Sequence, residues 1–246
     1  MSAVPAPAST RVSASAFVGP GVELGVGVSV APFAVLVGPA RIGDHVRIGP
    51  GAHVGGAPEI ATVRQNDAWD GDLDHFEVVV GDHTVLRDHV VIHHGSVRPT
   101  IIGSGCQLFS RTYVAHDVHV GDGVTLSAGV SLGGHVTVRP GANLGLNVSV
   151  HQRRVVGALA MVGMGTPVAR DVPPFATVYG VPARVRGTNR FGMERAGIDA
   201  GEIDAVEALL TDGAGPGACV GLSARVRAEL EWWSALPGRL AMADAR

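Results

Sequence analysis

An aliphatic residue, often followed by glycine, recurs every six positions along most of the chain. The series keeps its phase from Val12 to Val54, resumes at Val80 and continues to about Pro174. A six-residue step drifts around a 3.6-residue helix, so the pattern excludes a long amphipathic helix and favours short strands separated by turns. Hexads of this kind are typical of a parallel β-helix, in which three of them form one triangular coil. The sequence therefore predicts an all-β solenoid whose residues stack on one face at intervals of eighteen.

The turns between strands need residues that tolerate positive φ. Gly27, Asp44 and Gly51 follow the aliphatic positions of their hexads and are predicted to supply that conformation at the corners of the coils.

The solenoid is predicted to be interrupted twice and capped once. The hexad register is lost between Gly56 and Val78, and four extra residues, Arg98 to Ile101, are expected to loop out before Ile102 resumes it. Near the end of the chain, residues 200–210 and 222–236 have helical periodicity, and Asp199 or Asp204 would favour the first helix dipole. We expect a flexible lead at 1–11, a solenoid domain at 12–185 with an excursion at 56–77, and a helical domain at 186–246.

Composition agrees with a solenoid and narrows the function. The chain is 46% hydrophobic but only 4% aromatic, as expected where small aliphatic residues stack on one another. Its net charge of −3 and lack of a basic run argue against nucleic acid or membrane as the main partner. All nineteen basic residues are arginine, so a ligand's phosphate must be met by arginine, histidine or a backbone N–H.

The termini and cysteines carry weaker signals. The two cysteines, Cys106 and Cys219, predict neither a disulfide framework nor a thiolate zinc site. Residues 1–9 lack the features of a signal peptide or a membrane anchor, so a cytoplasmic protein without membrane insertion is expected.

Four histidines occupy one face of consecutive coils. With the aliphatic residue of each hexad as position 1, His93 and His151 stand at position 2, His116 at position 3 and His135 at position 4. Once the extra residues before Ile102 are allowed for, these hexads lie eighteen residues apart. The spacing predicts a row of imidazoles along one face of the prism.

The motifs that carry these residues resemble the UDP-N-acetylglucosamine O-acyltransferase family, which opens lipid A biosynthesis. They are, in order, Ile-His-His-Gly-Ser at 92–96, Val-Ala-His-Asp at 114–117, Leu-Gly-Gly-His-Val at 132–136, Val-His-Gln at 150–152 and Asp-Val-Pro-Pro at 171–174. The resemblance covers nearly the whole chain. It implies a left-handed parallel β-helix with a small C-terminal α-helical cap, a homotrimer, and active sites in clefts between subunits.

The resemblance also implies roles for individual residues. His116 matches the general base, Asp117 its orienting carboxylate and Gly134 the glycine whose N–H serves the oxyanion. The remaining matches line the substrate cleft or contact the donor or nucleotide: His135, His93, His151, Gln152, Asn189 and Arg195.

Acyl transfer from a thioester asks for the same equipment. It needs a base of near-neutral pKa for the acceptor and an N–H for the tetrahedral oxyanion. The chain shows no serine or cysteine elbow, so direct transfer is expected, with no metal and no bound cofactor.

Several positions depart from the family. Tyr113 stands where the family has a further cleft histidine, and the loop from Gly56 to Phe76 lacks the family's lysine-bearing sequence. Met164 occupies a position where glycine admits a long acyl tail in some members. The segment 179–184, Tyr-Gly-Val-Pro-Ala-Arg, looks more like coenzyme A-dependent transferases of amino sugars. The donor is thus expected to be an acyl carrier protein or acyl-CoA thioester, and the acceptor a hydroxyl or amine of a nucleotide-linked sugar or amino sugar.

Two other functions share the fold. A γ-class carbonic-anhydrase-like enzyme needs three histidine ligands, yet Arg111 stands five residues before His116, where that family has histidine. A non-catalytic trimeric binding protein would have no need of the His116-Asp117 pair with Gly134 one coil away.

Overall fold

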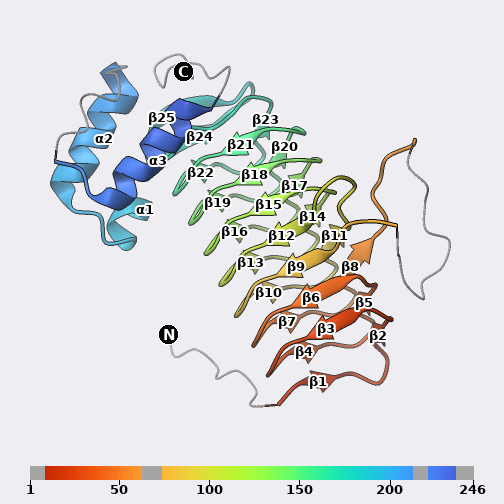
Figure 1. The fold of residues 1–246 in the computed structure, drawn as a ribbon. Coiled ribbons are helices and arrows are strands. Elements are labelled where there is room, and N and C mark those ends of the chain that lie inside the picture. Colours follow the sequence, from red (N-terminus) through yellow and green to blue (C-terminus); the bar gives the residue numbers. More distant parts are fainter. Residues whose placement is uncertain (1–8, 63–73, 213–220, 237–246) are drawn as a thin grey trace.

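A computed structural model of the chain describes residues 9–62, 74–212 and 221–236. They form a solenoid of short parallel strands with three helices at its C-terminal end (Figure 1). The predicted all-β solenoid with a helical cap is confirmed. None of the described helices is long and apolar enough to cross a membrane.

Three sheets form the sides of the prism. The first contains β1 (Arg11–Val12), β4 (Ser29–Val30), β7 (Arg47–Ile48), β10 (Val85–Leu86), β13 (Gln107–Leu108), β16 (Thr125–Leu126), β19 (Asn143–Leu144), β22 (Met161–Val162), β24 (Ala176–Tyr179) and β25 (Arg184–Thr188). The second contains β2 (Phe17–Val18), β5 (Val35–Leu36), β8 (His53–Gly56), β11 (Val91–His93), β14 (Tyr113–Val114), β17 (Ser131–Leu132), β20 (Ser149–Val150) and β23 (Pro167–Val168). The third contains β3 (Val22–Leu24), β6 (Ala40–Ile42), β9 (Val78–Val80), β12 (Thr100–Ile102), β15 (His119–Val120), β18 (Thr137–Val138) and β21 (Val155–Val156).

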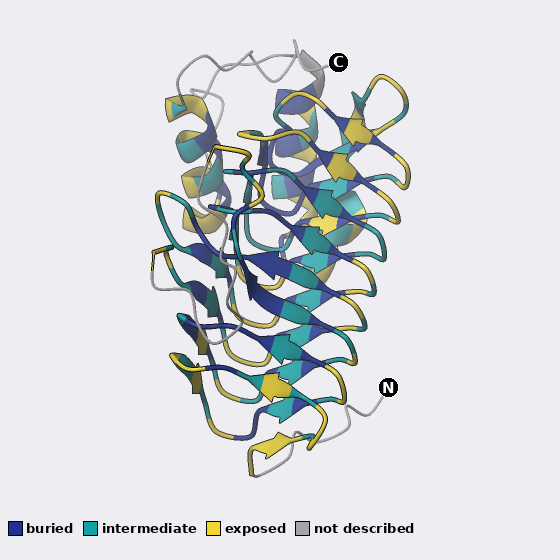
Figure 2. Ribbon diagram, turned by 90° about the vertical axis from the view of Figure 1, so that its right-hand side faces the viewer, coloured by how far each residue is buried: buried dark blue, intermediate teal, exposed yellow. Residues whose placement is uncertain are grey.

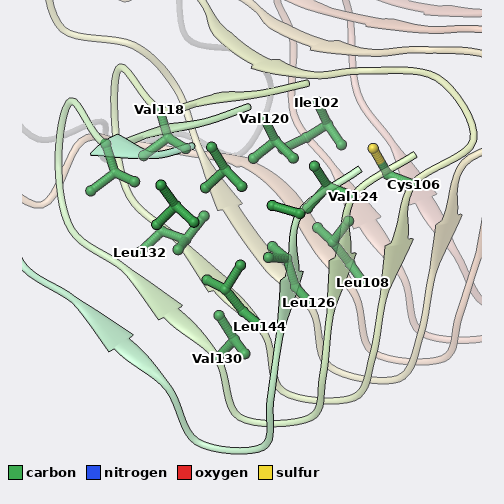
Figure 3. Close-up of a cluster of buried hydrophobic side chains, with 14 of the residues drawn as sticks. Ile102, Cys106, Leu108, Val118, Val120, Val124, Leu126, Val130, Leu132 and Leu144 are labelled. Atoms are coloured by element: carbon green, nitrogen blue, oxygen red, sulfur yellow. The ribbon is translucent and has the colours of Figure 1, made fainter. Parts of the chain in front are cut away.

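The core consists of the residues at positions 1 and 5 of the hexads, which are buried and stack from coil to coil. In the second sheet Val114 pairs with Leu132 and Leu132 with Val150, which confirms the eighteen-residue repeat. Leu108, Leu126 and Leu144 form the corresponding column of the first sheet and are fully buried (Figure 3). Each buried methylene contributes about 0.8 kcal/mol, so stability accumulates with every coil. At the N-terminal end the first strand is exposed, because no coil of the described residues precedes it (Figure 2).

Position 4 of the hexads turns the chain at each corner. Gly27 and Gly51 have φ of 68° and 64° there, as predicted. The prediction for Asp44 is wrong by one residue, because its neighbour His45 has the positive φ, at 57°. Asp44 stands at position 3, where its carboxylate accepts the Val26 N–H at 2.8 Å and joins adjacent coils.

Two insertions shift the stacking. Strand β8 pairs with β11 at an offset of 38 residues, so the excursion predicted at 56–77 lies between them, and its residues 63–73 are outside the described part of the chain. The second insertion adds four residues between β11 and β12, but its predicted place, Arg98 to Ile101, is wrong. Residues 100–102 form β12 and pair with β9 and β15, so the extension lies within residues 94–99.

The cap has one more helix than the periodicity predicted. Besides α2 (Ala200–Asp212) and α3 (Ala224–Ala235), a short α1 (Arg190–Arg195) begins directly after β25. Asp199 accepts the backbone N–H groups of Gly201 and Glu202 and so caps α2. The Arg139 guanidinium lies 4.2 Å from the Trp232 ring centre and binds Glu229, which ties α3 to the solenoid.

Candidate active site

The centre of the site is a histidine–carboxylate pair at the corner between the second and third sheets. The His116 Nδ1 lies 2.6 Å from the Asp117 Oδ2. Because the ionised carboxylate can only accept, Nδ1 carries the proton and Nε2 keeps its lone pair. No described residue hydrogen-bonds to Nε2, and the His116 side chain keeps 12% exposure. The arrangement therefore presents a basic nitrogen to solvent or substrate.

Asp117 is held by the short extension that precedes β12. Its Oδ1 accepts the backbone N–H groups of Ser96, Val97 and Arg98, each at 2.9 Å, and its Oδ2 accepts the Ser96 hydroxyl at 2.6 Å. The Arg98 guanidinium donates to the Asp117 carbonyl, and the Asp117 N–H donates to Thr100. The side chain is completely buried. The four extra residues thus build a cradle around one carboxylate.

The cradle keeps Asp117 ionised. Burial alone would raise its pKa, but hydrogen bonds from Ser96, Val97, His116 and Arg98 together outweigh it and lower the pKa below the ordinary value. A carboxylate that stays charged can fix the imidazole and stabilise it when it becomes an imidazolium.

We expect Ser96→Ala to lower the free energy of unfolding at neutral pH by about 1.5–3 kcal/mol, since it removes a short hydrogen bond to a buried charge. Ser96→Thr should retain stability because it keeps the hydroxyl. Ser127→Ala is the matched control, since no side-chain hydrogen bond of Ser127 occurs in the described structure, and it should change stability by less than about 0.5 kcal/mol. Denaturant unfolding measures all three.

The pH dependence of the same variants gives a second check. Because the folded-state pKa of Asp117 is lowered, its stabilisation is present above the unfolded pKa of about 3.9 and is lost as pH falls below it. The stability gap between wild type and Ser96→Ala should therefore narrow in acid. A gap that is absent at pH 7, or equally large for Ser127→Ala, would show that the Ser96 hydroxyl does not hold the carboxylate.

Gly134 lies against the His116 ring one coil further on. A Cβ built there would be 2.5 Å from the His116 Cε1 and 2.6 Å from Nε2, so no side chain fits without moving the ring. The Gly134 carbonyl accepts the Arg153 N–H, but among the described residues the Gly134 N–H has no acceptor. A free N–H beside a basic nitrogen is the donor that a tetrahedral oxyanion requires.

His135 completes the cluster. Its ring stands edge-on to that of His116, with centroids 5.1 Å apart, and its Nε2 lies 3.6 Å from the Asp117 Oδ2. Burial lowers the pKa of His135, and Arg153, His116 and Arg98 add to the effect, while Asp117 opposes it. His135 is therefore predominantly neutral at pH 7.

The pair His93 and Tyr113 forms a separate contact beside the excursion. The His93 Nδ1 lies 2.7 Å from the Ala57 carbonyl, and its ring centre is 5.2 Å from that of Tyr113. The Tyr113 hydroxyl donates to the Glu59 carboxylate at 2.6 Å. Burial and this carboxylate raise the pKa of Tyr113, so the phenol stays protonated.

The other predicted site residues lie further along the chain. His151 and Gln152 are exposed in the coil after Gly134, and Met164, 73% exposed, stands at the corner after β22 in the first sheet. Asn189 caps α1, accepting the Gly192 N–H and donating to the Leu159 carbonyl, and Arg195 is exposed in the last turn of that helix. One chain thus assembles the predicted catalytic group, and the Gln152 backbone adjoins it, since a Cβ at Gly133 would lie 2.7 Å from the Gln152 N. Met164 stands at a different corner, and Asn189 and Arg195 belong to the cap.

Sequence reasoning missed the cradle residues Ser96, Val97 and Arg98, as well as Glu59. The signal for the cradle in the sequence is the four-residue interruption of the hexads one coil before Asp117.

The side chains of His116, Asp117 and His135 offer donor atoms within 4.8 Å of one another. They do not suit a zinc ion. Bonds of about 2.0–2.1 Å in a tetrahedron keep ligand atoms about 3.3 Å apart, whereas the His116 Nδ1 and Asp117 Oδ2 are 2.6 Å apart and joined by a hydrogen bond. The other Asp117 lone pairs already accept hydrogen bonds, so the donor set disfavours the metal-dependent alternative.

Comparison with known proteins points to one family. Residues 171–211 match the family model described as UDP-N-acetylglucosamine O-acyltransferase, domain 2, and residues 99–134 match bacterial transferase hexapeptide repeats. An acyl-[acyl-carrier-protein]–UDP-N-acetylglucosamine O-acyltransferase of Bartonella bacilliformis is 37% identical over 215 residues, covering 79% of this chain and 76% of that one. The enzyme of the same name from Anaeromyxobacter is 38% identical over 175 residues, 70% of this chain and 65% of that one.

The chain spans 65% of the Anaeromyxobacter relative and 59% of another, from Gloeothece citriformis. Among solved structures, the UDP-N-acetylglucosamine acyltransferase of Campylobacter jejuni has the same fold, with a TM-score of 0.74 at 21% identity over 92% of this chain and 96% of that one. The Francisella novicida enzyme has a TM-score of 0.62 at 27% identity, covering 89% of this chain and 79% of that one. The protein belongs to the UDP-N-acetylglucosamine O-acyltransferase family.

Proposed function

We propose that the protein transfers an acyl group from a thioester to a hydroxyl of a nucleotide sugar. The observation that carries the proposal is the His116–Asp117 pair, whose free Nε2 lies against Gly134 and its unused N–H. The names of the relatives supply the substrate classes, an acylated carrier protein as donor and UDP-N-acetylglucosamine as acceptor.

The chemistry follows from the positions of these groups. The His116 Nε2 takes the proton of the acceptor hydroxyl as its oxygen attacks the thioester carbonyl carbon. The Gly134 N–H donates to the oxyanion that forms. When the tetrahedral intermediate collapses, the carbon–sulfur bond breaks, the thiolate takes the proton from the His116 imidazolium, and an ester remains on the sugar. Asp117 stabilises the imidazolium between these two steps.

The functional test is a transfer assay with the purified chain. Acyl carrier protein thioester and acyl-CoA are each supplied with UDP-N-acetylglucosamine, free thiol is titrated, and the sugar nucleotide is examined by mass spectrometry. We expect thiol release that depends on the acceptor and a product heavier by one acyl group, with the carrier-protein donor preferred. Alkaline hydroxylamine removes an ester but not an amide and so separates O- from N-acylation. Thiol release without an acylated sugar nucleotide would refute the proposal.

A homotrimer is part of the proposal, because one chain leaves Met164, Asn189 and Arg195 apart from His116. The corner after the first sheet carries Leu146 and Met164, which are 47% and 73% exposed. A neighbouring subunit would cover these two side chains, and its own His116–Asp117 pair would then lie close to them. Light scattering should give three times the chain mass of 25.2 kDa.

Met164 is proposed to limit the length of the acyl chain. Met164→Gly removes a side chain that projects from the corner, so we expect the preferred donor to be longer by several methylenes, each worth about 0.8 kcal/mol when buried. A series of donors of increasing chain length, assayed in competition, measures the shift. Leu146→Ala at the same corner is the comparison variant, and an unchanged length preference in Met164→Gly would exclude Met164 as the limit.

A further inference from the structure

An open groove of about 730 Å³ lies beside His135, on the side of the third sheet. Two arginines, Arg98 and Arg153, line it together with His135, and Ser96 and Thr137 add two hydroxyls. The remaining lining is aliphatic, and none of the described residues that line the groove is acidic. Its charged groups are therefore of one sign. Two carboxylates lie close to it: Asp117, which is buried, and Asp171, whose Oδ1 accepts the N–H of the groove residue Val155 at 2.7 Å.

Arg153 reaches the groove through the regular stacking of the corner. Asp117, His135 and Arg153 occupy position 4 of three successive coils, with φ of 61°, 61° and 62°. The His135 N–H donates to the His116 carbonyl and the Arg153 N–H donates to the Gly134 carbonyl, which fixes the register. Adjacent strands lie about 4.8 Å apart, so the His135 and Arg153 side chains start close together.

Arg98 enters from the cradle and is already oriented. Its Nε and Nη2 donate to the Asp117 carbonyl at 2.9 and 2.7 Å, while Nη1 has no such bond. Arg41, Arg139, Arg154 and Arg190 each have a carboxylate within 4.0 Å. Arg98 and Arg153 have no carboxylate within that distance among the described residues, so no described acidic group pairs directly with either guanidinium in the groove.

We propose that Arg98 and Arg153, with His135 between them, bind a phosphate group. Guanidinium groups match phosphate oxygens in pairs, and this chain has no lysine that could do so instead. The groove adjoins the His116–Asp117 pair through Ser96 and His135. A phosphate bound in the groove would therefore anchor a ligand whose other end reaches His116. That the phosphate is part of a substrate rests on the proposed function, but the anion site itself does not.

Titration calorimetry with inorganic pyrophosphate tests the site in the full chain. Arg153→Ala should weaken binding about tenfold or more, because it removes one of two cations. The matched control is Arg11→Ala: Arg11 is exposed in β1 at the N-terminal end of the solenoid, away from the groove, so this variant should bind pyrophosphate like wild type. Wild type that does not bind pyrophosphate, or equal affinities in the two variants, would overturn the proposal.

Two further pairs of ligands identify the source of the phosphate. Phosphopantetheine is compared with pantetheine, and UDP-N-acetylglucosamine with uridine, in wild type and Arg153→Ala. If the phosphopantetheine arm of the acyl donor occupies the groove, only phosphopantetheine should bind about tenfold more weakly to Arg153→Ala than to wild type. If the nucleotide occupies it, only UDP-N-acetylglucosamine should do so. Loss of neither overturns the assignment to a substrate. If acyl transfer is absent but Arg153→Ala still loses pyrophosphate binding, the anion site stands and the proposed function falls.

Discussion

His116→Ala is expected to lower kcat by about 100-fold or more, because general-base catalysis by a positioned side chain typically contributes that much. KM for the nucleotide sugar should change far less, since the imidazole acts mainly on the proton that is transferred in the transition state. The assay is thiol release at saturating donor and acceptor.

The variant should remain folded, since the His116 side chain is not part of the solenoid core. His83→Ala is the control, because His83 is exposed at a corner after the third sheet, away from both the His116–Asp117 pair and the corner that carries Met164, and its kcat should equal that of wild type. Turnover in His116→Ala within a few-fold of wild type would remove His116 from the mechanism.

Gly134→Ala should lower kcat by a comparable factor, because the added methyl group displaces the His116 ring. The added methyl would stand 2.5 Å from the His116 Cε1, so the ring must move from its place against Gly134. A displacement of about 1 Å in a catalytic group can cost about 100-fold in rate. Gly134 does not have a positive φ, so alanine meets no backbone strain and the loss can be assigned to the ring.

A double-variant cycle separates this displacement from general damage. In the His116→Ala background the ring is gone, so adding Gly134→Ala should produce almost no further loss of kcat or stability. Additive losses would mean that Gly134 acts independently of the ring.

The solenoid was predictable because its core repeats. Leu108, Leu126 and Leu144 meet identical surroundings in successive coils, so a period in the sequence translates directly into a column in space. The contact between His116 and His135 follows from the same rule, and their ring centroids lie 5.1 Å apart. Here the spacing of residues along the chain was sufficient to place side chains.

The cradle of Asp117 could not be predicted in the same way. Its donors come from residues 94–99, which break the repeat, and a period says nothing about the path of an insertion. The same limit explains why the extension was placed too late, at Arg98 to Ile101. The wrong prediction of a positive φ at Asp44 has another cause. The Asp44 carboxylate, at position 3, accepts a hydrogen bond from the adjacent coil, and the following residue, His45, adopts the positive φ.

The most direct test of the account is a crystal structure of the protein with UDP-N-acetylglucosamine bound. One sugar hydroxyl is expected within about 2.6–3.2 Å of the His116 Nε2, with the Gly134 N–H directed at the space beyond it. A sugar bound with every hydroxyl out of reach of that nitrogen, for instance along the first sheet, would contradict it.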